Sequence, residues 1–274
     1  MKNTKRKKVG LALGSGGAKG YAHLGVLKVL EENNIPIDYL SGASAGAIVA
    51  SLYSLYKDIK KVEEILTDFH KIRSLFDISF KGGILKGKKI VNFFEDIFQG
   101  KTFKDLEIPI CIIATDYVTG KEVRIKKGNI ALAVRASMAV PFVFELVNCK
   151  KKELADGGLS SPVPIRALKE MGADVTIGVR IEDKLDDGKK KNIYSMTERS
   201  INILQHNLAE YELNEADILL DPEFEGYGFL GVHKIIQGKI GEAIQEGERV
   251  TKEELTNIKR LIGSEKEISG IYKL

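Results

Sequence analysis

Cysteine is scarce in this sequence, which has only two in 274 residues, Cys111 and Cys149. This excludes a disulfide-based scaffold at this length and makes a reducing compartment the simpler interpretation. Neither cysteine has a partner at the C-x-x-C spacing of structural zinc sites, so we expect no metal centre of that kind. Histidine is nearly as scarce, with four residues. Few bases are therefore available to activate a nucleophile.

Long apolar runs are also missing, since no stretch approaches the ~18 residues that a membrane-spanning helix needs. Basic residues at 2–8 precede an apolar run, but glycines interrupt that run early, unlike a secretory signal. The formal net charge of +4 is too small to indicate a nucleic-acid partner. We therefore expect a cytoplasmic protein that does not bind nucleic acid. The lysine-rich segment at 189–192 is expected to be an exposed loop.

Apolar residues make up 43% of the chain and charged residues 29%, the usual balance of a globular protein. Short apolar strands alternate with helical patterns, beginning with a strand at 8–13 and a helix that Asn33 and Asn34 end. This alternation predicts an α/β fold with a largely parallel central sheet between helices. No linker or repeat is evident, so we expect one domain over 1–274, with a helical C-terminal part at about 193–274.

A glycine-rich turn, "LGSGGAKG" at 13–20, lies between the first strand and the first helix. Such a turn lets backbone N–H groups converge on an anion at the positive end of a helix. The spacing fits a dinucleotide-binding G-x-G-x-x-G poorly, and Gly20 is followed by Tyr21 rather than by the Lys-Ser/Thr of a phosphate loop. An oxyanion hole, another anion site and a purely structural turn all remain open from this segment alone.

A second glycine turn, "GASAG", places Ser44 between a short strand and an apolar helix. A strand-to-helix turn of this kind presents a nucleophilic serine in a strained, exposed conformation, so we favour this role over a helix cap. Asp156 stands in a third turn, "DGG", which is common in loops. Neither His206 nor His233 directly follows a strand, and only one strand precedes the serine turn. A Ser–His–Asp triad is therefore disfavoured.

Together "GSGGAKG", "GASAG" and "DGG" resemble the ordered motifs of the patatin-like phospholipase family, in its small single-domain bacterial form. The segment "ASMAVPFVF", ahead of "DGG", also resembles that family. The similarity runs from about residue 8 to 180. It implies a three-layer fold with a central sheet sandwiched between helices, and a carboxylic ester hydrolase activity on lipids.

The resemblance also implies roles for individual residues. Ser44 would attack the ester carbonyl, and Asp156 would take its proton and pass it to the leaving alcohol, as a Ser–Asp dyad. The oxyanion would be held by the backbone N–H groups of Gly16, Gly17 and Ala18. The supporting motif residues would be Gly14, Lys19, Gly20, Gly42, Gly46, Gly157 and Gly158. Ser15 departs from the glycine found in many members, but a backbone oxyanion hole tolerates a serine there.

Two other functions stay open from the sequence. An acyltransferase would use the same Ser44 nucleophile with an alcohol or thiol acceptor, and a nucleotide- or anion-binding regulatory protein would use only the glycine loop. The hydrolase needs no metal and no cofactor. Its partner would be a lipid ester, with peripheral contact to a membrane and with oligomerisation left open. The apolar face predicted at 228–244 is expected to pack in the core or a dimer rather than against lipid.

Overall fold

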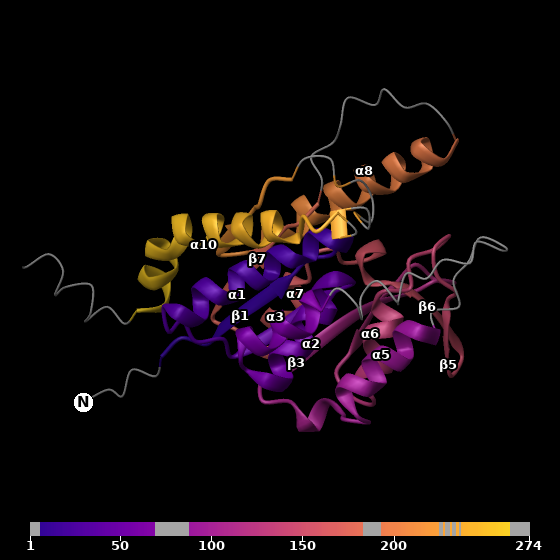
Figure 1. Cartoon of the computed structure of the whole chain (residues 1–274), viewed down its shortest axis with the longest axis horizontal. Helices are drawn as coiled ribbons and strands as arrows, with labels where there is room; N and C mark the ends of the chain where they lie inside the picture. Colours follow the sequence, from indigo (N-terminus) through magenta and orange to yellow (C-terminus); the bar gives the residue numbers. More distant parts are fainter. Residues whose placement is uncertain are drawn as a thin grey trace, which may run out of the picture.

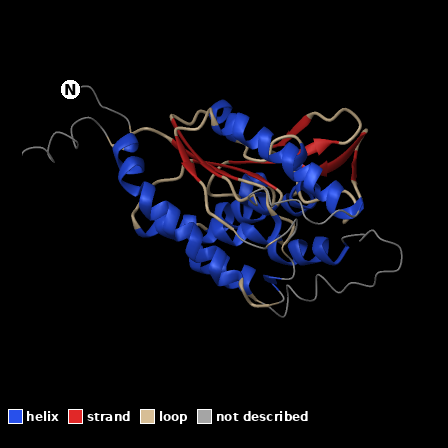
Figure 2. Cartoon of the chain, turned by 90° about the horizontal axis from the view of Figure 1, so that it is seen from above, coloured by secondary structure: helices blue, strands red, loops and turns tan. Residues whose placement is uncertain are grey.

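The computed structural model describes residues 6–68, 88–182, 193–224, 227, 231, 234–235 and 237–263. In this part of the chain, one eight-stranded sheet is covered by helices on both faces (Figures 1 and 2). The strands are β1 (Val9–Leu13), β2 (Tyr39–Ala43), β3 (Ile110–Asp116), β4 (Glu122–Ile125), β5 (Val147–Cys149), β6 (Lys152–Asp156), β7 (Val175–Val179) and β8 (Ile218–Leu220).

Helices follow most of the strands, as the alternating sequence pattern predicts. The α-helices are α1 (Ala22–Glu32), α2 (Ala45–Tyr56), α3 (Ile59–Thr67), α5 (Lys88–Phe98), α6 (Ile130–Ser137), α7 (Ile165–Met171), α8 (Ile193–Leu213) and α10 (Ile240–Ile262). Three short 3-10 turns are η1 (Gly17–Tyr21), η2 (Phe103–Asp105) and η3 (Gly157–Leu159). Local signals set several ends: the Asn129 side chain accepts a hydrogen bond from Leu132 N at the start of α6. Gly172, with φ 95°, ends α7.

The two sides of β1 face different helices because successive side chains of a strand point to opposite faces. Leu11 and Leu13 belong to the large core that contains residues of α1, α2 and α10. Ala12 belongs to a smaller cluster with residues of α7 and α8. The sheet is thus the middle of three layers, and the predicted fold class is confirmed.

The strand order is β5-β6-β3-β2-β1-β7-β8, with β4 attached to β3. The pairs formed by β1, β2, β3, β7 and β8 along this order are parallel, whereas β4, β5 and β6 pair antiparallel with their neighbours. Strands β3 and β4 form an antiparallel hairpin. Because the parallel strands run the same way, the residues that follow β1, β2 and β7 gather at one edge of the sheet.

The C-terminal ends of β2 and β6 meet along one edge of β3. Ile113 pairs with both Ala43 of β2 and Arg124 of β4, so these two strands take opposite edges of β3. Ala114 pairs with both Val123 of β4 and Asp156 of β6. Strand β6 must therefore share the edge that β2 occupies. This topology brings the residue after Ala43 close to Asp156, although the two lie more than a hundred residues apart in the sequence.

Helix α10 from the C-terminal part packs directly on α1 (Figure 1). A Cβ atom built on Gly25 would lie 2.0 Å from the carbonyl oxygen of Ile244, and one built on Gly247 would lie 2.0 Å from that of Ala22. The two backbones approach closely because each helix presents a glycine to the other. The C-terminal segment therefore supports the helix that begins immediately after the glycine loop.

Several sequence expectations differ from the structure in detail or lie outside it. Strand β5 was not expected, because its three residues are partly or fully exposed and have no alternating pattern. Helix α10 begins at Ile240, after a short helical turn at Lys234 and Ile235. The loop expected at 189–192 lies outside the described residues. Within the described part, no helix is long and apolar enough to span a membrane.

Candidate active site

The glycine loop leaves β1 and enters η1 with two backbone N–H groups free of bonds within the turn. The N–H of Gly14 donates to Val179 O and that of Ser15 to Pro162 O, which fixes the loop against neighbouring segments. Gly17 has φ 59°, a left-handed conformation that favours glycine. The first hydrogen bond of the turn runs from Lys19 N to Gly16 O at 3.3 Å. The N–H groups of Gly17 and Ala18 precede it and so have no partner within the turn.

Ser44 occupies a sharp turn between β2 and α2. Its φ of 52° and ψ of −118° are unusual for a residue with a side chain, at a typical cost of roughly 1–3 kcal/mol. The Ser44 N–H donates to Ser137 Oγ at 2.9 Å, a contact that holds the turn. A Cβ on Gly46 would lie 1.9 Å from Leu13 O. Only glycine therefore fits at this position, where α2 crosses the end of β1.

Asp156 ends β6 and is held by hydrogen bonds on three sides. Its N–H donates to Ala139 O at 2.9 Å, and its carbonyl accepts from Thr115 Oγ1 at 2.7 Å. The Gly158 N–H donates to Oδ1 at 2.8 Å. The other carboxylate oxygen, Oδ2, is buried and accepts no hydrogen bond in the part of the chain that the structure describes.

Burial changes the basicity of this carboxylate. The Asp156 side chain is almost wholly removed from water, which raises its pKa to about 6. The Ser44 hydroxyl and the Gly158 N–H both act in the opposite direction, because they interact favourably with the ionised form. The Ser44 hydroxyl thus lies near enough to the carboxylate to lower its pKa, and burial makes the carboxylate a stronger base than an exposed aspartate.

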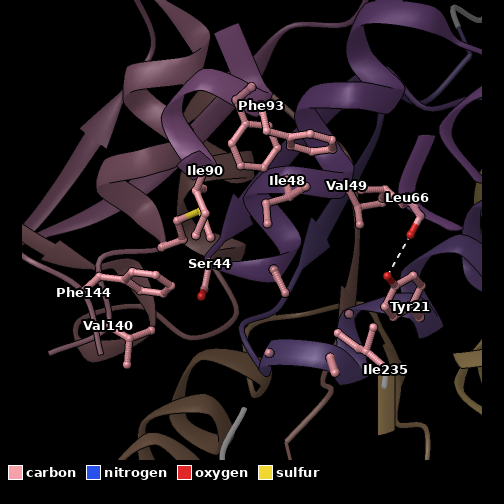
Figure 3. A pocket seen from close by; sticks show the side chains of 16 residues that line it. Tyr21, Ser44, Ile48, Val49, Leu66, Ile90, Phe93, Val140, Phe144 and Ile235 are labelled. Atoms are coloured by element: carbon pink, nitrogen blue, oxygen red, sulfur yellow. Dashed lines mark hydrogen bonds between the residues drawn. The ribbon is translucent and has the colours of Figure 1, made fainter. Parts of the chain in front are cut away.

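Two cavities meet at Ser44. The larger, of about 160 Å³, is almost wholly apolar. Figure 3 shows aliphatic and aromatic side chains around it, and its wall is held in part by the bond from the Tyr21 hydroxyl to Leu66 O. Its larger side chains come from Tyr21, Ile48, Val49, Leu66, Ile90, Phe93, Phe94, Met138, Val140, Phe144 and Ile235. Ile235, from the segment predicted to have an apolar face, is buried here.

The smaller cavity, of about 40 Å³, is polar. It brings together five of the residues singled out in the sequence, namely Ser44, Asp156, Gly16, Gly17 and Lys19. Other polar side chains in its wall are those of Ser15, Glu182, Asn202 and Gln205. Ala18 lines the apolar cavity instead, on the other side of the same turn.

The remaining motif glycines allow close backbone contacts around these cavities. A Cβ atom on any one of them would lie 2.3–2.7 Å from another heavy atom. The glycines concerned are Gly14, Gly20, Gly42, Gly157 and Gly158. Lys19 is only 3% exposed, so it is part of the loop's buried framework rather than a surface lysine.

The described histidines take other positions. His23 is buried in α1, where its Nε2 donates to Gly14 O at 2.9 Å and burial lowers its pKa to about 4. It is therefore neutral and supports the glycine loop. His206 lies 3.5 Å from both Glu182 and Glu210, and it does not line either cavity. His70 and His233 lie outside the described residues.

Four polar residues of the site were not predicted from the sequence, namely Ser137, Glu182, Asn202 and Gln205. Ser137 sits at the end of α6, and nothing in its local sequence indicates that it contacts Ser44. Glu182 follows β7 by three positions, and it lines the polar cavity. A charged residue just beyond the carboxyl end of a parallel strand is the one signal that could have indicated Glu182.

Comparison with known proteins agrees with these motifs and their order. The family model described as patatin-like phospholipase matches residues 11–169, more than half of the chain, including Ser44 and Asp156. The chain belongs to the patatin-like phospholipase family. An uncharacterised NTE family protein of Mycobacterium tuberculosis is 31% identical over 224 residues, which are 81% of this chain and 62% of that protein.

Human patatin-like phospholipase domain-containing protein 6 is 29% identical over 190 residues, covering 65% of this chain and 14% of the human protein. The chain thus spans less than two thirds of the length of these curated relatives. Among solved structures, VipD from Legionella pneumophila superposes with a TM-score of 0.60 at 17% identity, over 92% of this chain and 67% of VipD. That likeness supports the patatin-like fold.

Proposed function

We propose that this patatin-like protein is a serine acyl hydrolase that cleaves carboxylic esters of lipids through a Ser44–Asp156 dyad. The observation that carries the proposal is the position of Ser44. It stands in a strained turn between an apolar cavity and a buried carboxylate of raised basicity. Hydrolysis of a fatty acyl ester requires an apolar space for the acyl chain and a base beside the nucleophile that attacks the carbonyl carbon.

In the acylation step, Ser44 Oγ attacks the ester carbonyl carbon, and its proton passes to Asp156 Oδ2. The resulting tetrahedral intermediate collapses as the bond from carbon to the alcohol oxygen breaks. The proton on Asp156 then moves to the departing alkoxide, which leaves as a neutral alcohol. The products of this step are an acyl ester on Ser44 and an ionised Asp156, ready for a second cycle.

In the deacylation step, water takes the place of the alcohol. Asp156 accepts a proton from the water as its oxygen attacks the acyl carbon. The bond from carbon to Ser44 Oγ then breaks, and the proton on Asp156 returns to Oγ. A fatty acid is released and the enzyme is restored. A base with a pKa near 6 is ionised at neutral pH and can act in both steps.

Negative charge on the carbonyl oxygen needs donors that are already in place. The N–H groups of Gly17 and Ala18 have no partner within η1, and both residues line the cavity that contains Ser44. The N-terminus of α2 begins beside Ser44 and adds a favourable dipole. Loss of one such donor typically costs about 3–4 kcal/mol of transition-state stabilisation. We assign Gly16, Gly17 and Ala18 to the oxyanion hole.

A fluorophosphonate probe tests the dyad directly, because it reacts with an activated serine hydroxyl. We expect the wild-type protein to be labelled and to hydrolyse p-nitrophenyl esters of fatty acids. Ser44→Ala should abolish both properties, and Asp156→Asn should slow both by at least about a hundredfold. Ser51→Ala is the matched control, since Ser51 is a buried serine of the same helix, α2, but lines neither cavity.

A folded protein that is not labelled and hydrolyses no ester would contradict the proposal, and so would equal labelling of Ser44→Ala. Product analysis separates hydrolysis from acyl transfer. We expect free fatty acid as the main product even when glycerol is added. Predominant formation of a glycerol ester would instead identify an acyltransferase with the same nucleophile.

A further inference from the structure

Glu182 is a buried carboxylate in the wall of the polar cavity that the dyad does not use. Its side chain is 11% exposed. Neither carboxylate oxygen accepts a hydrogen bond within the described part of the protein. Burial raises the pKa of Glu182 to about 7, because the charged form is poorly solvated there.

No neighbouring side chain in the described part of the protein donates a hydrogen bond to the Glu182 carboxylate. Arg180 lies on the same segment, but its guanidinium is bonded to Asp221. His206 Nδ1 lies 3.5 Å from Oε2, too far for a strong hydrogen bond. Arg180 and Lys19 favour the ionised form of Glu182 through their charges, without a hydrogen bond to it. Native proteins rarely leave buried acceptors unpaired, so an unpaired carboxylate on a residue that lines a cavity indicates a ligand that carries donors.

The position of this carboxylate relative to Ser44 indicates which part of a substrate it meets. An ester has an acyl side and an alcohol side, and Ser44 lies where the two cavities join. The apolar cavity suits the acyl chain. The polar cavity, whose wall also includes Asn202 and Gln205 of α8, then receives the alcohol. Asp156, which hands its proton to the leaving alcohol, lines the same polar cavity.

We propose that Glu182 determines specificity for the leaving alcohol by accepting hydrogen bonds from its free hydroxyl groups. The substrate class is a monoacyl ester of a small polyhydroxy alcohol such as glycerol. This inference rests on the proposed hydrolase function. An anionic headgroup fits less well, because two acidic residues, Glu182 and Asp156, line the same small cavity of about 40 Å³ against one basic residue, Lys19.

Two dodecanoyl esters that differ only in donor groups test the assignment. One is 1-monododecanoylglycerol, and the other is the same ester with both free hydroxyls methylated. The ratio of their kcat/KM values isolates the contribution of the hydroxyl groups. We expect the wild-type enzyme to prefer the hydroxylated ester, and Glu182→Leu to reduce that preference by about ten- to a hundredfold, as loss of a hydrogen bond to a charged group does.

Glu182→Gln keeps an acceptor oxygen and the side-chain shape, so it should lose only part of the preference. It also keeps the test open if the leucine variant does not fold. Glu210→Gln is the matched control, because this carboxylate also lies 3.5 Å from His206 but is 60% exposed and lines neither cavity. We expect its ratio to equal that of the wild-type enzyme.

An unchanged ratio of kcat/KM values in Glu182→Leu would overturn the inference, whether the variant loses activity equally on both esters or on neither. Dodecanoylcholine separates donors from charge, since it is cationic but has no donor on its alcohol. If Glu182→Leu lost activity mainly on dodecanoylcholine rather than on 1-monododecanoylglycerol, Glu182 would recognise positive charge and the hydroxyl assignment would be wrong. Failure of the wild-type enzyme to hydrolyse any of these esters would contradict the proposed function itself, which distinguishes the two cases.

Discussion

The two cavities at Ser44 differ in the kind of structure that builds them. The polar cavity is lined largely by residues at the ends of strands and in the glycine loop, such as Ser15, Asp156 and Glu182. The apolar cavity is lined mostly by helix side chains, such as Ile48 of α2 and Phe93 of α5 (Figure 3). The sheet thus fixes the positions of Ser44 and Asp156, and helix side chains shape the larger, apolar cavity beside them.

This difference predicts which substitutions change the chemistry and which change only the choice of substrate. Backbone positions at strand ends are set by hydrogen bonds to neighbouring strands, so a change there moves the nucleophile or the base. A helix side chain can be replaced while the helix stays in place, provided that the new side chain fits.

Gly46→Ala should have the largest effect, because it disturbs the turn that holds Ser44, which lines both cavities. The added Cβ would lie 1.9 Å from Leu13 O, so α2 or β1 has to shift and Ser44 moves with them. A displacement of about 1 Å at a reacting group costs about a hundredfold in rate. We expect at least that loss of p-nitrophenyl ester hydrolysis, together with a lower melting temperature.

Gly241→Ala is the control for this substitution. A Cβ on Gly241, in α10, meets no other atom within 4 Å. Alanine is the better helix former by roughly 0.5–1 kcal/mol, so this variant should be as stable as the wild type or slightly more stable. Full activity and stability in Gly46→Ala would show that the turn is not held as tightly as the close contact indicates.

The polar side should control the pH dependence of catalysis. Asp156 must be ionised to act as a base, and its pKa is raised to about 6. The kcat/KM for a p-nitrophenyl ester should therefore fall about tenfold for each pH unit below 6 and level off above it. Glu182→Leu should keep this acidic limb. Loss of the limb in that variant would mean that Glu182, not Asp156, is the group observed.

The raised pKa of Asp156 makes it a better base, but it also lowers the stability of the folded protein at neutral and higher pH. A carboxyl group whose pKa is higher in the folded state binds its proton more tightly there, so stability falls as pH rises from about 4 to about 6. A rise of about two pKa units corresponds to about 3 kcal/mol at pH 8. Asp156→Asn should therefore be more stable than the wild type at pH 8. In urea unfolding the gap should close below pH 4, and a gap that is constant with pH would contradict this account.

Sequence patterns predicted the parts of the site that depend on local chemistry. The glycine turns near Gly17 and Ser44 are recognisable because small residues follow a short apolar strand and precede a helix. The pairing of Ser44 with Asp156 followed from resemblance to a family, and the topology now supplies a physical reason. Strands β2 and β6 share one edge of β3, and no local pattern shows which edge a strand will take.

The walls of the cavities were much harder to predict. Phe93, Phe144 and Ile235 come from separate segments, and each has the pattern of an ordinary core residue. Glu182 is one charged residue among many in a chain that is 29% charged. Its burial depends on α8, which covers the cavity from a different part of the sequence. Tertiary packing therefore decides these residues' roles.

The apolar side should control acyl-chain length without changing the chemistry. Ile235→Trp would fill part of the cavity of about 160 Å³. We expect kcat/KM for p-nitrophenyl dodecanoate to fall about tenfold while that for the acetate stays near the wild-type value. Leu204→Trp is the control, because this residue is 68% exposed on α8. Equal losses on both esters would mean that Ile235 supports the fold rather than the chain-binding space.

The smallest effects should come from the histidines, which separate a Ser–Asp dyad from a histidine-dependent triad. His23 is neutral and bonded to a loop carbonyl, and His206 lies beside Glu182 and Glu210 rather than in the cavities. Single replacement of each of the four histidines by glutamine should keep p-nitrophenyl ester hydrolysis within about tenfold of the wild-type rate. His23→Gln tests this most severely, because the residue is buried, and its melting temperature should be measured alongside its activity. If any histidine variant were as inactive as Ser44→Ala while remaining folded, that histidine would be the base and Asp156 its orienting partner.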